Sequence, residues 1–173
     1  LRKSQNLDSD NVEKIRIKTI QRAAEILSDP AKYDPETRET ADHSLPYCIA
    51  VAIADGKGTT EQFREERILD PALRPLMNKI EVVAEPSFEE MFPALQPCEV
   101  TVVKADGSEV TERMDYPMGD PRNPMTPEQM ENKFDALSGP FLSEGSARRV
   151  KDAIANAESA GTVRELMETF VAD

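Results

Sequence analysis

The chain is built around RETADHSLPYCIAVAIADG, at residues 38–56. The part at 45–53 is apolar on nearly every side, which is typical of a helix that is buried all round. Ser44 is a good N-cap for this helix, because its hydroxyl can accept from a free amide of the first turn. Pro46 sacrifices no hydrogen bond there, since the amide that it lacks would have no partner. This stretch predicts a capped, buried helix that ends before Gly56.

Strand patterns flank this helix on both sides. In the first strand, apolar side chains near-alternate with charged ones, and Ile80 and Val82 share one face of the second. The third and fourth form a hairpin around Asp106 and Gly107, a pair suited to the positive φ angles of tight turns. The expected strands are 12–19, 79–84, 98–104 and 109–116. Together with helices at 20–27 and 72–78, they predict an α+β fold with a small antiparallel sheet.

The chain changes character at the Pro-rich connector PMGDPRNPM, residues 117–125. Thr126, Pro127 and Gln129 then form a capped helix start. Two further amphipathic helices, at 143–157 and 162–171, need a surface to cover their apolar faces. The expected division is an α+β domain at 1–117, which the resemblance described below implies to be a lid, and a C-terminal helical segment at 118–173.

Composition and charge exclude several classes of protein. The 173 residues carry a net charge of −12, and the densest basic cluster, at 148–151, is too short to bind a nucleic-acid backbone. No stretch approaches the roughly 20 apolar residues of a membrane helix. Cys48, Cys98 and the lone His43 do not make a zinc set, and two isolated thiols fit a reducing compartment. We expect no nucleic acid, no membrane and no metal, and a cytoplasmic location.

The start of the buried helix is the candidate site. His43 precedes the cap, Tyr47 projects from the first turn, and Arg38 lies a few residues upstream. A helix N-terminus favours an anion, so a carboxylate could be held and a proton moved at this point. On spacing alone a structural role is favoured, because helix caps are far commoner than active sites. In the structural interpretation, Arg38 does no more than pair with a neighbouring carboxylate. Asp42 could either orient His43 or simply add negative charge near the helix start.

A resemblance changes this balance. Residues 38–56 resemble the signature in the C-terminal half of the MmgE/PrpD family, which includes 2-methylcitrate dehydratases, cis-aconitate decarboxylases and an iminodisuccinate epimerase. YPMGDPRNPMTPEQMENKF at 116–134 is similar to the family's turn that introduces a helix ending in Lys-Phe. The hairpin and the closing TVRELMETF helix stand in the expected order. The resemblance covers essentially the whole chain.

The resemblance implies the C-terminal part of a longer, metal-independent and cofactor-free lyase. In the family, a large all-helical domain accompanies a smaller α+β lid, and the last helices return to the helical domain. The absence of Met before Leu1 fits a cut through such a protein, which would be a homodimer and inactive as this fragment alone. The implied catalytic residues are Tyr47 and His43, with Ser44 and Arg38 binding a small di- or tricarboxylate.

Dehydration like that of 2-methylcitrate dehydratase, in propionate metabolism, is the expected reaction. The chain departs from the dehydratase branch within ETADHSLPY, so decarboxylation and epimerisation or isomerisation stay open. A non-catalytic α+β module for interaction or dimerisation is the alternative of another class.

Overall fold

A computed structural model describes residues 1–171, which divide into two compact units, one ending at Asn123 and the other beginning at Pro124. The first unit holds all four strands, and the second is helical. The assignment of 1–117 to a lid and of 118–173 to the helical domain of a longer protein stays a prediction.

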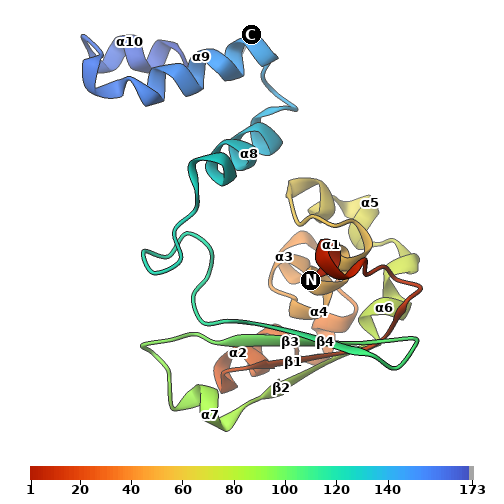
Figure 1. The fold of residues 1–173 in the computed structure, drawn as a ribbon. Helices are drawn as coiled ribbons and strands as arrows, with labels where there is room; N and C mark the ends of the chain where they lie inside the picture. The colour runs from red at the N-terminus through yellow and green to blue at the C-terminus, as the bar shows by residue number, and fades with distance from the viewer. Residues whose placement is uncertain (172–173) are drawn as a thin grey trace. The chain divides into compact units, whose positions relative to one another are not determined.

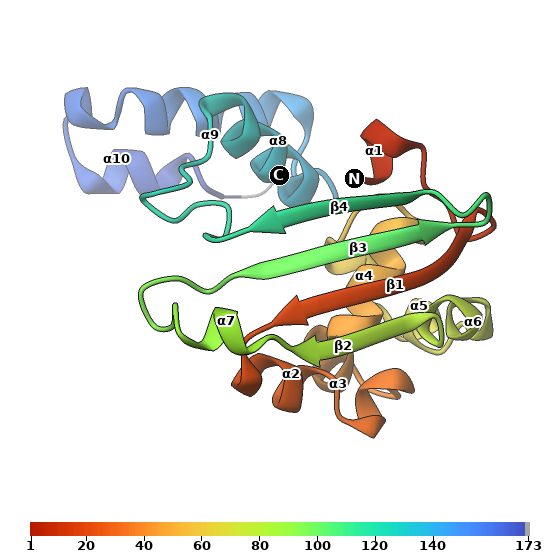
Figure 2. The same ribbon diagram turned by 60° about the horizontal axis from the view of Figure 1, so that its bottom comes forward.

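The first unit contains a four-stranded sheet in the order β2-β1-β3-β4 (Figure 2). The strands are β1 (Val12–Thr19), β2 (Ile80–Ala84), β3 (Cys98–Lys104) and β4 (Glu109–Met114). The α+β class is confirmed, but the sheet is mixed and not purely antiparallel as expected. β1 and β2 run parallel, whereas β1 pairs with β3, and β3 with β4, in antiparallel register. A parallel pair requires a long crossover connection, and the helices between β1 and β2 supply it.

The crossover carries most of the helices of this unit, and Figure 1 shows α4 and α6 on one side of the sheet. The α-helices of the unit are α1 (Arg2–Gln5), α2 (Gln21–Leu27), α3 (Arg38–Asp42), α4 (Leu45–Ala54), α5 (Glu65–Ile68), α6 (Arg74–Met77) and α7 (Pro86–Glu89). Its 3₁₀ helices are η1 (Pro30–Tyr33), η2 (Thr60–Phe63) and η3 (Pro71–Leu73). The predicted central helix is confirmed as α4, whereas α3 and η1 were not predicted from the sequence.

The two faces of the sheet differ in polarity. Ile15, Ile17 and Val102 are at most 1% exposed and belong to one apolar core with Tyr47 and Val51 of α4. The alternate positions of the strands carry charges, which pair across the sheet (Lys14 with Glu81, and Lys18 with Glu99). Such alternation fixes the register, because a one-residue slip would turn the charged side chains into the core.

The hairpin is confirmed, with Gly107 at φ +82° in its turn. The second unit contains α8 (Pro127–Ser138), α9 (Glu144–Ala155), η4 (Ala157–Ser159) and α10 (Val163–Glu168). The predicted cap of α8 is also confirmed: the Thr126 hydroxyl accepts from the Gln129 amide, and the Gln129 side chain accepts from the Thr126 amide. This capping box satisfies two amides that the helix itself leaves without partners.

Candidate active site at the junction of α3 and α4

Three of the four candidate residues lie where α3 ends and α4 begins, and Arg38 is the first residue of α3. Thr37 starts α3, because its hydroxyl accepts from the amide of Thr40, and His43 is the C-cap of that helix. Ser44 is the N-cap of α4 and accepts from the amide of Tyr47 at 3.0 Å. The same hydroxyl donates to the carbonyl of Lys32 in η1. Ser44 thus ties three short elements together, and this fixes the backbone on both sides of His43.

His43 is exposed and is held along one edge of its ring. Its Nδ1 lies 2.9 Å from the carbonyl oxygen of Glu39 and 2.7 Å from Oδ1 of Asp42. The side chain is 62% exposed. The bond to the Glu39 carbonyl, with the adjacent Asp42 carboxylate, raises the pKa of His43 above its ordinary value of 6.5. This imidazole is therefore an exchangeable proton carrier at the surface of the unit.

Tyr47, in the first turn of α4, is fully buried. Its hydroxyl donates to the backbone carbonyl of Gln62, and its ring lies 5.7 Å from that of Phe63, tilted by 57°. None of the side chain is exposed, and burial raises the pKa of the phenol to about 12. Tyr47 therefore stays protonated at neutral pH. A catalytic role requires that its bond to Gln62 breaks when a substrate binds.

An ion-pair network holds the partner of Tyr47 in place. The Gln62 side chain donates to Oδ2 of Asp55 at 3.1 Å, which joins η2 to the end of α4. Arg67 donates to both carboxylate oxygens of Asp55, at 2.6 and 3.1 Å, and also bonds Asp70. A bidentate guanidinium–carboxylate pair has fixed geometry, so this network positions the carbonyl that Tyr47 meets.

The structure brings three of the four predicted site residues, His43, Ser44 and Tyr47, to the junction of α3 and α4, whereas Arg38 is the first residue of α3, and the four differ in depth. Arg38 and His43 are exposed, whereas Ser44 and Tyr47 are buried. Among residues 1–171, Arg38 forms no ion pair, so its guanidinium is available to an anion. The catalytic roles of Tyr47 and His43, and the binding roles of Ser44 and Arg38, stay predictions.

Arg74 supports the site and was not identified from the sequence. It donates to Asp34 at 2.6 Å and to the carbonyls of Pro35 and Ile68 at 3.1 Å each. These contacts fasten the segment before α3 to α6. The Asp34 contact spans 40 residues of sequence, so no local pattern could have revealed it.

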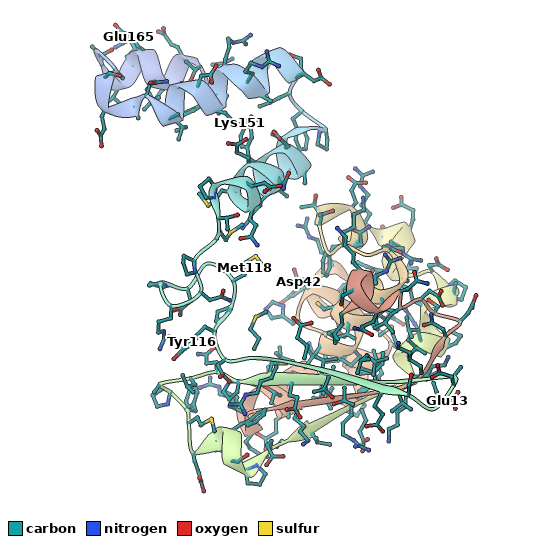
Figure 3. All side chains as sticks on the ribbon, in the orientation of Figure 1. Glu13, Asp42, Tyr116, Met118, Lys151 and Glu165 are labelled. Atoms are coloured by element: carbon teal, nitrogen blue, oxygen red, sulfur yellow. The ribbon has the colours of Figure 1, made fainter. Side chains whose placement is uncertain are left out.

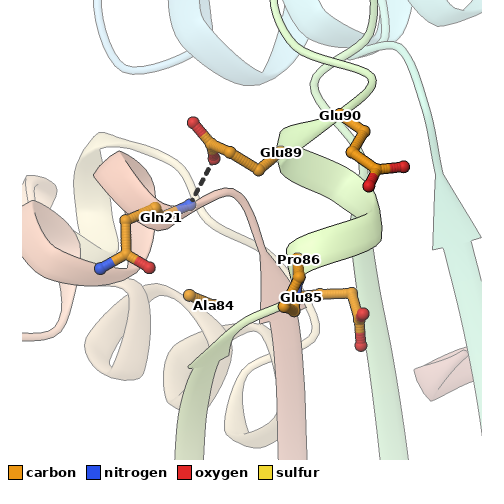
Figure 4. Close-up of a pocket in the computed structure, with 6 residues that line it drawn as sticks. All are labelled: Gln21, Ala84, Glu85, Pro86, Glu89 and Glu90. Carbon is orange, nitrogen blue, oxygen red and sulfur yellow. Dashed lines mark hydrogen bonds between the residues drawn. The ribbon is translucent and has the colours of Figure 1, made fainter.

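A separate pocket of about 520 Å³ lies at the end of β2 (Figure 4). Its lining includes the carboxylates of Glu85, Glu89 and Glu90, and Glu89 accepts from the amide of Gln21 at 2.9 Å. Three carboxylates repel an anionic ligand, so this pocket does not suit a di- or tricarboxylate. It contains none of the predicted site residues.

Residues 1–171 contain no group of three or more His, Cys, Asp or Glu side chains placed to hold a metal ion. Within the same residues, none of the helices combines the length and hydropathy that crossing a membrane requires. The expected lack of a cofactor stays a prediction.

Comparison with known proteins places this domain. Residues 1–159 match the family model described as the MmgE/PrpD C-terminal domain. The chain therefore belongs to the MmgE/PrpD family, as its motifs indicated.

The chain is similar to curated lyases of that family. It is 32% identical to the human cis-aconitate decarboxylase over 124 residues, which are 72% of this chain and 26% of that protein. It is 31% identical to the mouse cis-aconitate decarboxylase over 108 residues, 62% of this chain and 22% of that protein. It is 26% identical to the mitochondrial 2-methylcitrate dehydratase of Yarrowia lipolytica over 149 residues, 82% and 28% respectively. The chain thus spans about a quarter of the length of these relatives.

Proposed function

We propose that this chain is the C-terminal part of a lyase that acts on a small di- or tricarboxylate, and that His43 transfers a proton to or from the substrate. The observation that carries the proposal is the exposed imidazole at the α3–α4 junction, fixed by Glu39 and Asp42. The bond to the Glu39 carbonyl and the adjacent Asp42 carboxylate raise the pKa of His43, so they favour its protonated form, and an imidazole is the side chain most often used as a general acid or base.

Both reactions named for the relatives suit such a group. Dehydration removes a proton from the carbon next to a carboxylate and expels a hydroxyl group. Decarboxylation breaks a carbon–carbon bond and returns a proton to the carbon that keeps the electron pair. In each case one imidazole can carry the proton, and fixed cations or amides must hold the remaining carboxylates.

Dehydration of a 2-methylcitrate-like hydroxy acid is our first proposal for the reaction. It is supported by the Yarrowia dehydratase, which matches 82% of this chain. Decarboxylation of cis-aconitate is the second, and the higher identity of 32% to the human decarboxylase supports it.

The junction does not by itself offer enough positive charge for a tricarboxylate. Arg38 is the one cation of α3 and α4, and among residues 1–171 it forms no ion pair. Lys32 lies nearby on η1. We therefore propose that further cations come from an all-helical domain or from the second copy of a homodimer. The relatives, about four times as long as their matched parts, have room for such a domain.

The test is turnover of 2-methylcitrate and cis-aconitate by the native protein, isolated from its source, and by the His43→Asn variant. New carbon–carbon double bonds report dehydration by their absorbance, and released carbon dioxide reports decarboxylation. We expect a loss of about 10²–10⁴-fold in kcat for His43→Asn, the usual contribution of a general acid–base group. Glu36→Gln, at an exposed position nearby, is the matched control and should retain the wild-type rate. If neither substrate is turned over, a non-catalytic interaction module is the better explanation.

A further inference from the structure

We propose that the Glu39 carbonyl and the Asp42 carboxylate hold neutral His43 as the Nδ1–H tautomer, so that Nε2 is the atom that exchanges a proton with substrate. Asp42, labelled in Figure 3, is thereby a positioning residue that acts through His43. The tautomer is a property of the chain itself. Its catalytic meaning rests on the proposed function.

The chemistry of the two contacts decides which nitrogen carries the proton. A backbone carbonyl has no proton to donate, and an ionised carboxylate only accepts. Both oxygens approach the same ring nitrogen, Nδ1, at 2.9 and 2.7 Å. Nδ1 must therefore be the donor, and in the neutral ring Nε2 is left with the lone pair.

The local backbone enforces this arrangement. Glu39 lies four residues before His43, and its carbonyl belongs to the last turn of α3, where a helix leaves its carbonyls without partners. The His43 ring supplies the missing donor. Thr37 caps one end of α3 and Ser44 ties the other end to Lys32, so the oxygen and the ring are held on a short, fixed segment. Turning the ring over would break both contacts to Nδ1.

The charges around His43 favour its protonation on balance. The hydrogen bond to Glu39 contributes most to the raised pKa, and the bond to Asp42 and the charge of that carboxylate follow. Lys32, on η1, acts in the opposite direction. On the α4 side, the titratable neighbours of the junction are Tyr47, whose pKa is raised to about 12 so that it stays neutral, and Cys48, whose thiol points at the Ala41 carbonyl at 3.9 Å. Burial raises the pKa of that thiol, so it stays neutral and adds no charge.

The tautomer assigns a direction to proton transfer. In dehydration, the C–H electron pair becomes the new double bond, its proton goes to Nε2, and the C–O bond breaks. The leaving hydroxide takes a proton to become water, which restores the neutral ring if Nε2 supplies it. In decarboxylation the ring starts as the imidazolium: the C–C bond breaks, carbon dioxide leaves, the electron pair stays on the substrate carbon and takes the proton of Nε2, and a proton from solvent restores the imidazolium. In both reactions Nδ1–H keeps its two oxygens, so Asp42 stabilises the imidazolium throughout.

The composition of the chain makes the test direct, because His43 is its one histidine. Nitrogen-15 and carbon-13 NMR of the labelled 173-residue chain therefore reports this ring without assignment ambiguity. Above the pKa of His43 we expect the Nδ1–H form to predominate, the opposite of free histidine in water. A ring that is mainly Nε2–H in the wild type would overturn the proposal.

Two variants test the part played by Asp42. Asp42→Asn should lower the pKa of His43 toward its ordinary value, and Asp42→Glu should restore part of the shift. Glu36→Gln, six residues earlier and exposed, should leave the titration unchanged. An unchanged pKa in folded Asp42→Asn would remove Asp42 as a positioning residue. If Asp42→Asn does not fold, the wild-type tautomer alone decides the proposal.

The outcome separates the two proposals, since the NMR measurement needs no substrate. An Nδ1–H ring with unaffected turnover in His43→Asn would leave the tautomer standing and end the proposed role in catalysis. A loss of turnover in His43→Asn together with an Nε2–H ring would support the proposed role in catalysis and overturn the assigned tautomer. In the active native protein, Asp42→Asn should move the acidic limb of the kcat/KM profile to lower pH, which a purely structural role would not do.

Discussion

Tyr47→Phe tests how the junction is held together. The substitution removes the hydroxyl that donates to Gln62 while keeping the ring that packs against Phe63. Tyr47 is fully buried and Gln62 is 6% exposed, so the Gln62 carbonyl loses its donor in a place that water reaches poorly. Leaving a buried acceptor without its partner costs about 1–3 kcal/mol. For a chain of this size that corresponds to a fall in Tm of roughly 2–12 °C.

The decrease in the free energy of unfolding at alkaline pH gives a second measure of the same substitution. The pKa of Tyr47 is about 12 in the folded protein and 10.0 in its ordinary state. The unfolded chain therefore loses this proton first, so the contribution is complete below pH 10 and is lost as pH rises through 12. A difference of this size corresponds to roughly 3 kcal/mol. The wild type should lose more stability than Tyr47→Phe between pH 10 and 12.

Urea denaturation at pH 7 and across pH 9–12 measures both effects. Tyr116→Phe, on a partly exposed tyrosine, is the matched control and should change stability less. Equal stability of Tyr47→Phe and wild type at pH 7, with the same alkaline fall, would refute the reasoning. A fall in kcat in the native protein, beyond the loss of folded molecules, would instead support the predicted catalytic role of Tyr47.

Three further substitutions test the fold around the site. Arg67→Met leaves the half-buried Asp55 carboxylate without its bidentate partner, and we expect a loss of about 2–3 kcal/mol in urea denaturation. Gly107→Ala forces a side chain into a turn residue at φ +82° with no atom within 4 Å, so backbone strain alone should cost about 1 kcal/mol, whereas Gly58→Ala should be neutral or slightly stabilising. Thr126→Ala removes the capping hydroxyl of α8 and should destabilise that helix by about 1 kcal/mol, so the helical circular dichroism signal should be lost at a lower temperature than in the wild type. An unchanged melting curve would contradict the role of the cap.

Local patterns were enough to predict the elements that local chemistry specifies. The all-apolar stretch with Ser44 in front of it could only be a capped, buried helix, and α4 is that helix. Asp106 and Gly107 marked the hairpin turn, and Thr126 marked the start of α8, for equally local reasons. α3 was missed because RETAD has no apolar periodicity, and Thr37 was its single visible signal.

Long-range contacts explain what the sequence did not reveal. The parallel pairing of β1 and β2 depends on how a crossover of several helices folds back, which no single segment encodes. The depth of Tyr47 depends on Gln62, 15 residues away, and the position of α3 depends on Arg74, which reaches Asp34 across 40 residues. The motif placed the candidate residues in one junction, but it could not say that His43 would be exposed and Tyr47 covered.

The most direct test of the central claim is kcat of the native protein with His43→Asn on the tricarboxylate that it turns over best. Glu36→Gln is measured beside it, and the folded fraction of each variant is fixed by circular dichroism. The account predicts a loss of about 10²–10⁴-fold for His43→Asn and none for the control. A folded His43→Asn protein with the wild-type kcat would contradict it.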